Sequence, residues 1–246
     1  MDTRTLFAAA LCAAALGVGC APSQDTGPVA RSTPVPVKEV MTAEAQQALT
    51  PAQVLADLKE GNRRFVEGRL TPRDYLAQAS ATVAGQFPKA ILLSCVDSRV
   101  PPEIIFDQGI GDLFVARVAG NVEDVNLLGS IEFATKVAGA KLIVVLGHSA
   151  CGAIKGAADG VEMANLTDLL EEFDEVLAEV RASNDGPGDS SDTEFIARVV
   201  EENVRETMDD LVSRSPILTE LVESGEVGIA GGVYDLATGR VSWLDS

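Results

Sequence analysis

The apolar residues of this chain fall into short continuous runs that are separated by longer amphipathic segments. Short apolar runs bounded by polar turns are typical of strands that are buried on both faces. In the longer segments the apolar residues recur every three or four positions, which is the spacing of one helix face. The runs that we assign to strands are 90–96, 113–118, 142–146 and 227–233, and a last short strand is expected at 241–244 after a tight turn.

Helical spacing fills the intervals between these runs. Thr50 and Pro51 supply an N-cap and a first-turn proline for the first helix. Further helices are predicted in the segments 127–137, 166–181 and 192–213. Strands that alternate with helices build a parallel sheet covered by helices. We therefore expect one α/β domain with a mostly parallel central sheet and an antiparallel edge strand at the C-terminus.

The first residues of the chain have a different character. Residues 6–18 form an almost unbroken run of small and apolar side chains, which has the length of a signal-peptide core and is short for a membrane span. Small residues then precede Cys20, as in bacterial lipoprotein signals. We predict a signal peptide over 1–20 with a lipid anchor at Cys20, and a periplasmic or cell-envelope location. A flexible linker rich in Pro, Ser and Thr is predicted over 21–41, and the folded domain over 42–246.

The composition narrows the classes of partner. The chain has 246 residues, of which 46% are apolar and 23% charged, as expected of a globular protein with one sizeable core. Its formal net charge is −18. Nucleic-acid grooves and anionic membrane surfaces favour clustered Lys and Arg, so neither is an expected partner. Contact with a membrane is expected only through Cys20, and the remaining partners are a small-molecule substrate and further copies of the chain.

Candidate chemistry gathers where two of the predicted strands end. The first strand finishes in Ser94-Cys95-Val96-Asp97-Ser98-Arg99 and the third in Gly147-His148-Ser149-Ala150-Cys151-Gly152. Ligands of open parallel sheets bind beyond the carboxyl ends of the strands. Cys95, His148 and Cys151 make a ligand set suited to one Zn²⁺ per chain, and three protein ligands leave the fourth position open, as in catalytic sites. A disulfide between the two cysteines is the alternative for an exported protein.

The motif Cys-x-Asp-x-Arg at Cys95, Asp97 and Arg99, followed by His-x-x-Cys at His148 and Cys151, resembles the ligand pattern of β-carbonic anhydrases. The resemblance runs from about residue 51 to the C-terminus and includes the segments 61–65 and 234–239. It implies zinc-dependent, reversible hydration of carbon dioxide to bicarbonate and a proton by zinc-bound hydroxide.

The resemblance also implies roles for individual residues. Asp97 would accept a hydrogen bond from the zinc-bound water, and Arg99 would hold the Asp97 carboxylate. In members of the plant-type, open-site branch, the substrate pocket is built at the positions of Gln86, Phe114, Phe133 and Gly152. Phe133 replaces a tyrosine of that branch. The family also implies a homodimer or a higher homo-oligomer, in which the N-terminal helices pack on the partner subunit and the partner supplies pocket walls.

Two further functions remain open at this point. Relatives on the same zinc scaffold hydrolyse carbon disulfide or carbonyl sulfide with the same ligands, and a non-catalytic zinc-binding or disulfide module would need neither Asp97 nor Arg99. His148 is the only histidine of the chain. If it binds zinc, no second histidine is left to relay the product proton. We therefore expect proton transfer through water to buffer, with help from Asp97 or Tyr234 at most.

Overall fold

The computed structural model describes residues 35–245. The predicted signal peptide, the anchor at Cys20 and the predicted linker as far as residue 34 lie outside the described residues. Within the described part, Val37 forms a β-bridge with Arg73, and Lys38 forms an ion pair with Asp74. The chain therefore contacts the folded domain ahead of residue 42. No helix in residues 35–245 is long and apolar enough to span a membrane.

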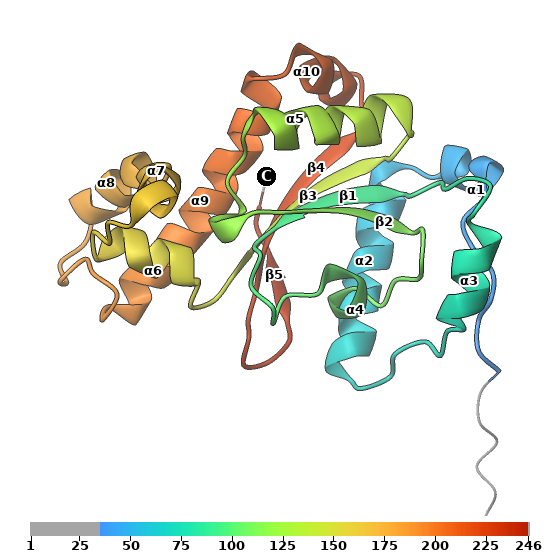
Figure 1. Ribbon diagram of the computed structural model, residues 1–246, viewed down its shortest axis with the longest axis horizontal. Helices are drawn as coiled ribbons and strands as arrows, with labels where there is room; N and C mark the ends of the chain where they lie inside the picture. Colours follow the sequence, from blue (N-terminus) through green and yellow to red (C-terminus); the bar gives the residue numbers. More distant parts are fainter. Residues whose placement is uncertain (1–34, 246) are drawn as a thin grey trace, which may run out of the picture. The chain divides into compact units, whose positions relative to one another are not determined.

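A five-stranded sheet forms the centre of the domain (Figure 1). Its strand order is β2-β1-β3-β4-β5, in which the first four strands are parallel and β5 is antiparallel to β4. Every residue of the neighbouring strands β1 and β3 is buried. The predicted fold class is confirmed. The strands are β1 (Ala90–Ser94), β2 (Leu113–Arg117), β3 (Leu142–His148), β4 (Gly228–Tyr234) and β5 (Val241–Trp243).

Helices cover both faces of the sheet because alternate residues of each central strand point to opposite sides. Leu92 packs in a core with Val54 and Leu58 of α2, whereas Leu93 packs in a second core with residues of α5, α9 and α10. The helices are α1 (Ala43–Ala48), α2 (Pro51–Val66), α3 (Tyr75–Ala81), α4 (Pro102–Ile105), α5 (Val125–Glu132), α6 (Gly152–Ala158), α7 (Ala164–Glu171), α8 (Asp174–Ala182), α9 (Thr193–Ser213) and α10 (Pro216–Glu223), with single turns η1 (Ala119–Asn121) and η2 (Phe133–Val137).

The predicted start of the first long helix is confirmed. The Thr50 side chain accepts a hydrogen bond from the backbone N–H of Gln53, and the Gln53 side chain reaches back to the N-cap backbone, which makes a capping box. The predicted helix over 166–181 is instead two helices, α7 and α8. They are separated at Phe173, which is fully buried. A continuous amphipathic pattern did not reveal this break.

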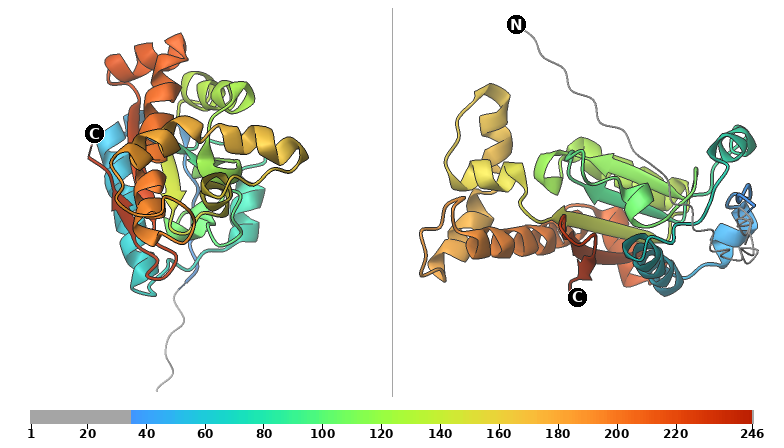
Figure 2. Two further views of the ribbon diagram at one scale, coloured as in Figure 1. Left: turned by 90° about the vertical axis from the view of Figure 1, so that its left-hand side faces the viewer. Right: turned by 90° about the horizontal axis from the view of Figure 1, so that it is seen from below.

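Helices α6, α7 and α8 pack beside the first half of α9 (Figure 2). Their apolar residues form a third core that also includes Cys95 and Cys151. This core adjoins the carboxyl ends of β1 and β3. These helices therefore pack against the region where the predicted metal ligands lie.

Candidate metal centre and active site

The three predicted metal ligands meet at one edge of the sheet. Cys95 directly follows β1, His148 is the last residue of β3, and Cys151 is the N-cap of α6. Because β1 and β3 are neighbouring parallel strands, their carboxyl ends lie side by side. The ligand atoms of the three residues lie within 4.8 Å of one another, and the residues are at most 4% exposed. The structure therefore brings together Cys95, His148 and Cys151, the three residues predicted as metal ligands.

A tight turn brings Cys151 back towards His148. Ala150 has a φ of 55°, in the left-handed region that non-glycine residues seldom adopt. Ser149 secures the turn on β4 and the loop after it, because its N–H donates to the Tyr234 carbonyl (2.9 Å) and its Oγ accepts from Leu236 N–H (3.0 Å). The backbone strain at Ala150 is therefore held by contacts outside the turn.

The donor set fits a zinc ion. His148 Nδ1 lies 3.0 Å from the Ser149 carbonyl oxygen, which fixes the proton on Nδ1 and leaves the Nε2 lone pair free. Nε2 is buried and has no hydrogen-bond partner. Both cysteines are free thiols, and a hydrogen bond from the Cys151 thiol lowers the pKa of Cys95. An unpaired buried nitrogen beside an easily ionised thiol is costly unless a cation binds them both.

Asp97 and Arg99 lie at the border of this ligand group. The Arg99 guanidinium donates from Nε to Asp97 Oδ1 (2.9 Å) and from Nη2 to Oδ2 (2.7 Å). These bonds hold the pKa of the Asp97 carboxyl well below its usual range. Asp97 Oδ2 lies 3.9 Å from His148 Nε2. An ionised carboxylate is thus held in a fixed orientation next to the metal ligands.

Arg117 is a site residue that the sequence analysis missed. It ends β2, and its guanidinium donates from Nε to the Cys95 carbonyl (2.8 Å) and from Nη2 to the Asp97 carbonyl. Arg117 therefore holds the backbone of the loop that carries both a metal ligand and the carboxylate. The available signal was a polar residue at the carboxyl end of a predicted strand, the position that also drew attention to Cys95 and His148.

The predicted substrate contacts divide into two groups. Gly152 directly follows Cys151, and a Cβ on it would meet nothing within 4 Å, so this part of the site is open. Gln86 is exposed ahead of β1, and Phe114 lies near the start of β2, where it pairs with Ile91. Strands rise about 3.3 Å per residue. Gln86 and Phe114 therefore lie towards the amino ends of the parallel strands, whereas Cys95 lies at the carboxyl end of β1.

Phe133 lies with Phe114, away from the metal ligands. Its ring makes an edge-on contact with Phe114 at 6.2 Å, and 52% of the residue is exposed. Gln86, Phe114 and Phe133 are therefore not brought to the metal ligands of their own chain. They remain predicted pocket residues.

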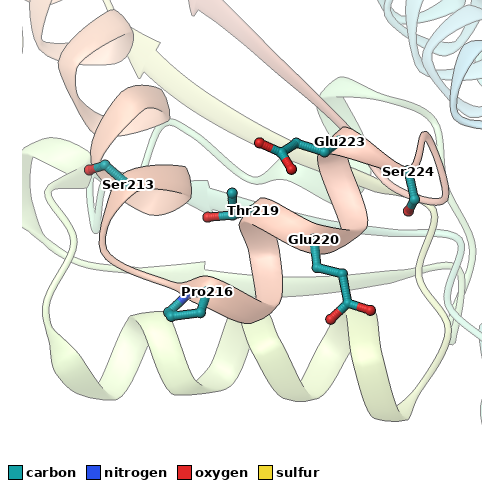
Figure 3. A pocket seen from close by; sticks show the side chains of 6 residues that line it. All are labelled: Ser213, Pro216, Thr219, Glu220, Glu223 and Ser224. Carbon is teal, nitrogen blue, oxygen red and sulfur yellow. The ribbon is translucent and has the colours of Figure 1, made fainter.

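A surface hollow at the junction of α9 and α10 is lined by Ser213, Pro216, Thr219, Glu220, Glu223 and Ser224 (Figure 3). The Thr219 hydroxyl is already within hydrogen-bond distance of two carbonyls, that of Val212 in α9 (2.7 Å) and that of Ser215 (2.9 Å). The hollow lies at the far end of the 21-residue helix α9 from α6. It contains none of the groups of the metal centre, and we assign it no role in the chemistry.

Comparisons with known proteins agree with this site. A family model described as carbonic anhydrase matches residues 90–241. Carbonic anhydrase 2 of Mycobacterium tuberculosis is 41% identical over 197 residues, which covers 79% of this chain and 93% of that protein. The carbonic anhydrase of Mycolicibacterium smegmatis is 38% identical and covers 78% of this chain and 92% of its own length.

Solved structures show the same fold. The β-carbonic anhydrase of Aspergillus fumigatus matches with a TM-score of 0.62 and 25% identity over 79% of this chain and 90% of that chain. The Coccomyxa β-carbonic anhydrase in complex with acetazolamide matches with a TM-score of 0.60 and 27% identity over 77% and 86%. The chain belongs to the β-carbonic anhydrase family, whose members are zinc enzymes that hydrate carbon dioxide.

Proposed function

We propose that this chain hydrates carbon dioxide at a site in which Asp97 and Arg99 control the nucleophile and a second copy of the chain completes the substrate pocket. The observation that carries the proposal is the buried, unpartnered Nε2 of His148 beside two free thiols, with an ionised carboxylate 3.9 Å away. Zinc, when bound by Cys95, His148 and Cys151, lowers the pKa of a coordinated water to about 7 and so supplies a hydroxide nucleophile.

Asp97 orients that nucleophile. Because Arg99 keeps the carboxylate ionised, Asp97 accepts hydrogen bonds and donates none. Its Oδ1 accepts from both Arg99 N–H and Nε–H, whereas Oδ2, which faces His148, accepts only from Nη2. Oδ2 therefore has capacity to accept a hydrogen bond from the O–H of the nucleophile, which would direct an oxygen lone pair towards the carbon of the substrate.

Hydrolysis of carbon disulfide or carbonyl sulfide is not favoured, because the matched relatives are carbonic anhydrases. A disulfide module is not favoured either, because Cys95 and Cys151 are free. The decisive measurement is stopped-flow carbon dioxide hydration by the metal-analysed protein lacking residues 1–20, alongside Cys151→Ser. Turnover with about one zinc per chain, lost together with the metal in the variant, supports the proposal. Zinc without turnover contradicts it.

Gln86, Phe114 and Phe133 lie away from the metal ligands of their own chain, so a second copy would have to bring them to a metal centre. Apolar side chains are exposed around these residues, including Val125 and Val137 on the helix that carries Phe133. Where such residues form a contiguous patch, the patch is typical of an interaction surface. A similar solved structure, with 25% identity, is of a β-carbonic anhydrase from Sordaria macrospora described as tetrameric. We propose a dimer or higher homo-oligomer with pocket walls exchanged between copies.

Subunit complementation tests this exchange. Chains with Cys151→Ser and chains with Gln86→Ala are each expected to be impaired, and co-expression should restore activity because one mixed site keeps both native residues. The matched control pairs Cys151→Ser with Asp97→Asn, two changes within the same chain's metal centre. One site of that mixed dimer then lacks a ligand and the other lacks the carboxylate, so no activity should return. Restoration in neither mixture would exclude a shared pocket.

We further propose that the enzyme is exported and anchored at Cys20. The support is the apolar run at residues 6–18 and the small residues before Cys20. Expression of the full chain with and without Cys20→Ser, followed by fractionation, tests this. The native chain is expected with the membranes and the variant in the soluble envelope fraction. Recovery of both from the cytoplasm would refute export.

A further inference from the structure

The sulfur of Cys95 accepts a hydrogen bond from the protein backbone. Gly120 N–H donates to Cys95 Sγ at 3.3 Å, and this contact is buried. Gly120 lies in η1, the single turn that follows β2 beside the end of β1. A donor on a metal-binding thiolate withdraws charge from the sulfur and orients it, so it influences both metal affinity and the acidity of the metal.

The Gly120 peptide is held in place by its own conformation and by one aromatic ring. Its φ is 72°, a left-handed value that glycine adopts without strain. A Cβ at this position would lie 2.2 Å from Cζ of Phe173, so the bare Cα also makes room for that ring. The buried Phe173 at the junction of α7 and α8 thus packs directly against the donor peptide.

Asn203 provides the third constraint. Its side chain donates from Nδ2 to the Gly120 carbonyl at 2.9 Å, across 83 residues of sequence. Asn203 is 3% exposed and lies on α9 between the buried residues Val200 and Val204. A side-chain amide in such surroundings is destabilising unless it is hydrogen-bonded. Its bond to Gly120 fixes the peptide plane that follows the donor N–H.

We propose that Asn203 is a positioning residue for the metal centre. It holds the Gly120 peptide so that the Gly120 N–H stays on Cys95 Sγ, and it thereby keeps this ligand ordered and its charge reduced. The role rests on the proposed function in one respect, since it requires Cys95 to bind zinc. It extends the centre to α9, a helix that contributes no metal ligand.

Two variants and one control separate this role from simple packing. Asn203→Leu keeps most of the side-chain volume and removes the donor. Asn203→Asp keeps the shape and presents an oxygen where Nδ2–H was. The control is Asn62→Leu, because Asn62 is also a buried asparagine whose Nδ2 donates to backbone carbonyls, those of Ile105 (3.2 Å) and Gly239 (2.9 Å). Asn62 lies on α2 and contacts no residue of the metal centre.

The readouts are zinc affinity, from competition with a chromophoric chelator, and the thiolate-to-cobalt charge-transfer band of the Co²⁺-loaded protein. Both Asn203 variants are expected to bind zinc about 10- to 100-fold more weakly, the usual effect of losing an outer-shell partner, and to shift the band. Asn62→Leu should lower the melting temperature and leave both readouts unchanged. Native affinity and a native band in a folded Asn203 variant would overturn the proposal.

A measurement on the native protein keeps the proposal testable if the variants do not fold. With ¹¹³Cd in the site, scalar coupling between the metal and the Gly120 amide proton is expected through the N–H···S bond. Absence of that coupling would contradict the proposed hydrogen bond. Failure of the proposed function is distinguishable, because a chain that binds zinc without hydrating carbon dioxide would still give these metal readouts.

Discussion

The loop after β1 and the loop after α4 each hold an aspartate bound by arginine. The Asp97 carboxylate has one arginine partner, Arg99, and that partner is 58% exposed at its side chain. Asp107 is bound by Arg64, Arg73 and Thr71, and only 1% of its own side chain is exposed. The same pair of functional groups is thus open and partly satisfied in one loop, and closed and fully satisfied in the other.

This difference separates a carboxylate that acts on a ligand from one that holds the fold. The Asp107 carboxylate and carbonyl accept bonds from residues 64, 71 and 73, so they tie α2 and the following loop to α4. No acceptor capacity is directed to solvent. Asp97 keeps Oδ2 directed at the metal ligands. Mutation should therefore affect activity at Asp97 and stability at Asp107.

Asp97→Asn should give the largest effect. The amide keeps the shape but presents a donor where the nucleophile needs an acceptor, so kcat/KM is expected to fall by about 10²- to 10⁴-fold, the usual contribution of such a group. The melting temperature and the zinc content should stay close to native values. Stopped-flow hydration and metal analysis check this, and a loss of less than tenfold would remove Asp97 from the proposed mechanism.

The metal ligands were predictable because sequence order alone places them at strand ends. Cys95 and His148 follow neighbouring buried strands, and Cys151 is three residues from His148. The parallel sheet and its antiparallel edge followed from the same apolar runs. The short helices α1, α3 and α4 were not predicted, since six, seven and four residues carry too little periodicity.

The supporting contacts of the site could not be predicted, because they join residues far apart in the chain. Arg117 reaches the Cys95 carbonyl across 22 residues, and Asn203 reaches Gly120 across 83. The break between α7 and α8 lies at Phe173, which packs against Gly120, and the helical pattern of the sequence does not reveal such a tertiary contact. Hydrophobic periodicity identifies which face of an element is buried, and it does not identify the group that the face meets.

Asp107→Ala should have the next largest effect, on stability. Removing the buried carboxylate takes the ion-pair partner from Arg73 and leaves Arg64 only its longer pair with Glu60 (3.8 Å), so the free energy of unfolding is expected to fall by about 3 kcal/mol. The kcat/KM of the remaining folded protein should be native. Urea unfolding at matched protein concentrations measures the change. A native unfolding midpoint, or a loss of activity without a loss of stability, would contradict the assignment of Asp107 to stability.

The pH dependence of stability tests the structural role of Asp107 further. Burial raises the pKa of Asp107, but hydrogen bonds from Arg64, Thr71 and Arg73 outweigh burial and lower the pKa overall. A lowered pKa stabilises the fold fully above the unfolded value, about 3.9, and that stabilisation is lost as pH falls through the folded pKa. The stability difference between native protein and Asp107→Asn should therefore shrink below about pH 4. An equal difference at pH 7 and pH 3 would refute this ionic contribution.

The product proton is expected to leave the site through water to buffer. His148 is the only histidine and lies in the ligand group, and burial raises the pKa of Tyr234, which keeps its hydroxyl protonated near neutral pH. Asp97 is 16% exposed at its side chain, but the Arg99 guanidinium holds its pKa well below the usual range, so it stays ionised near neutral pH and gives little help as a relay. Turnover at saturating carbon dioxide is expected to rise several-fold with buffer concentration. Turnover that is independent of buffer would require a relay within the protein.

The smallest effects should come from exchanging arginine for lysine in the two loops. Arg99→Lys keeps the charge but loses the paired donors on Asp97, so the carboxylate turns more freely and kcat should fall a few-fold without a change in melting temperature. Arg64→Lys removes the Nε donor from Asp107 and should lower the free energy of unfolding by roughly 1–2 kcal/mol with native kcat. Measuring both quantities for both variants makes each the control of the other. If Arg99→Lys lost stability and Arg64→Lys lost activity, the two loops would not differ in function as their geometry requires.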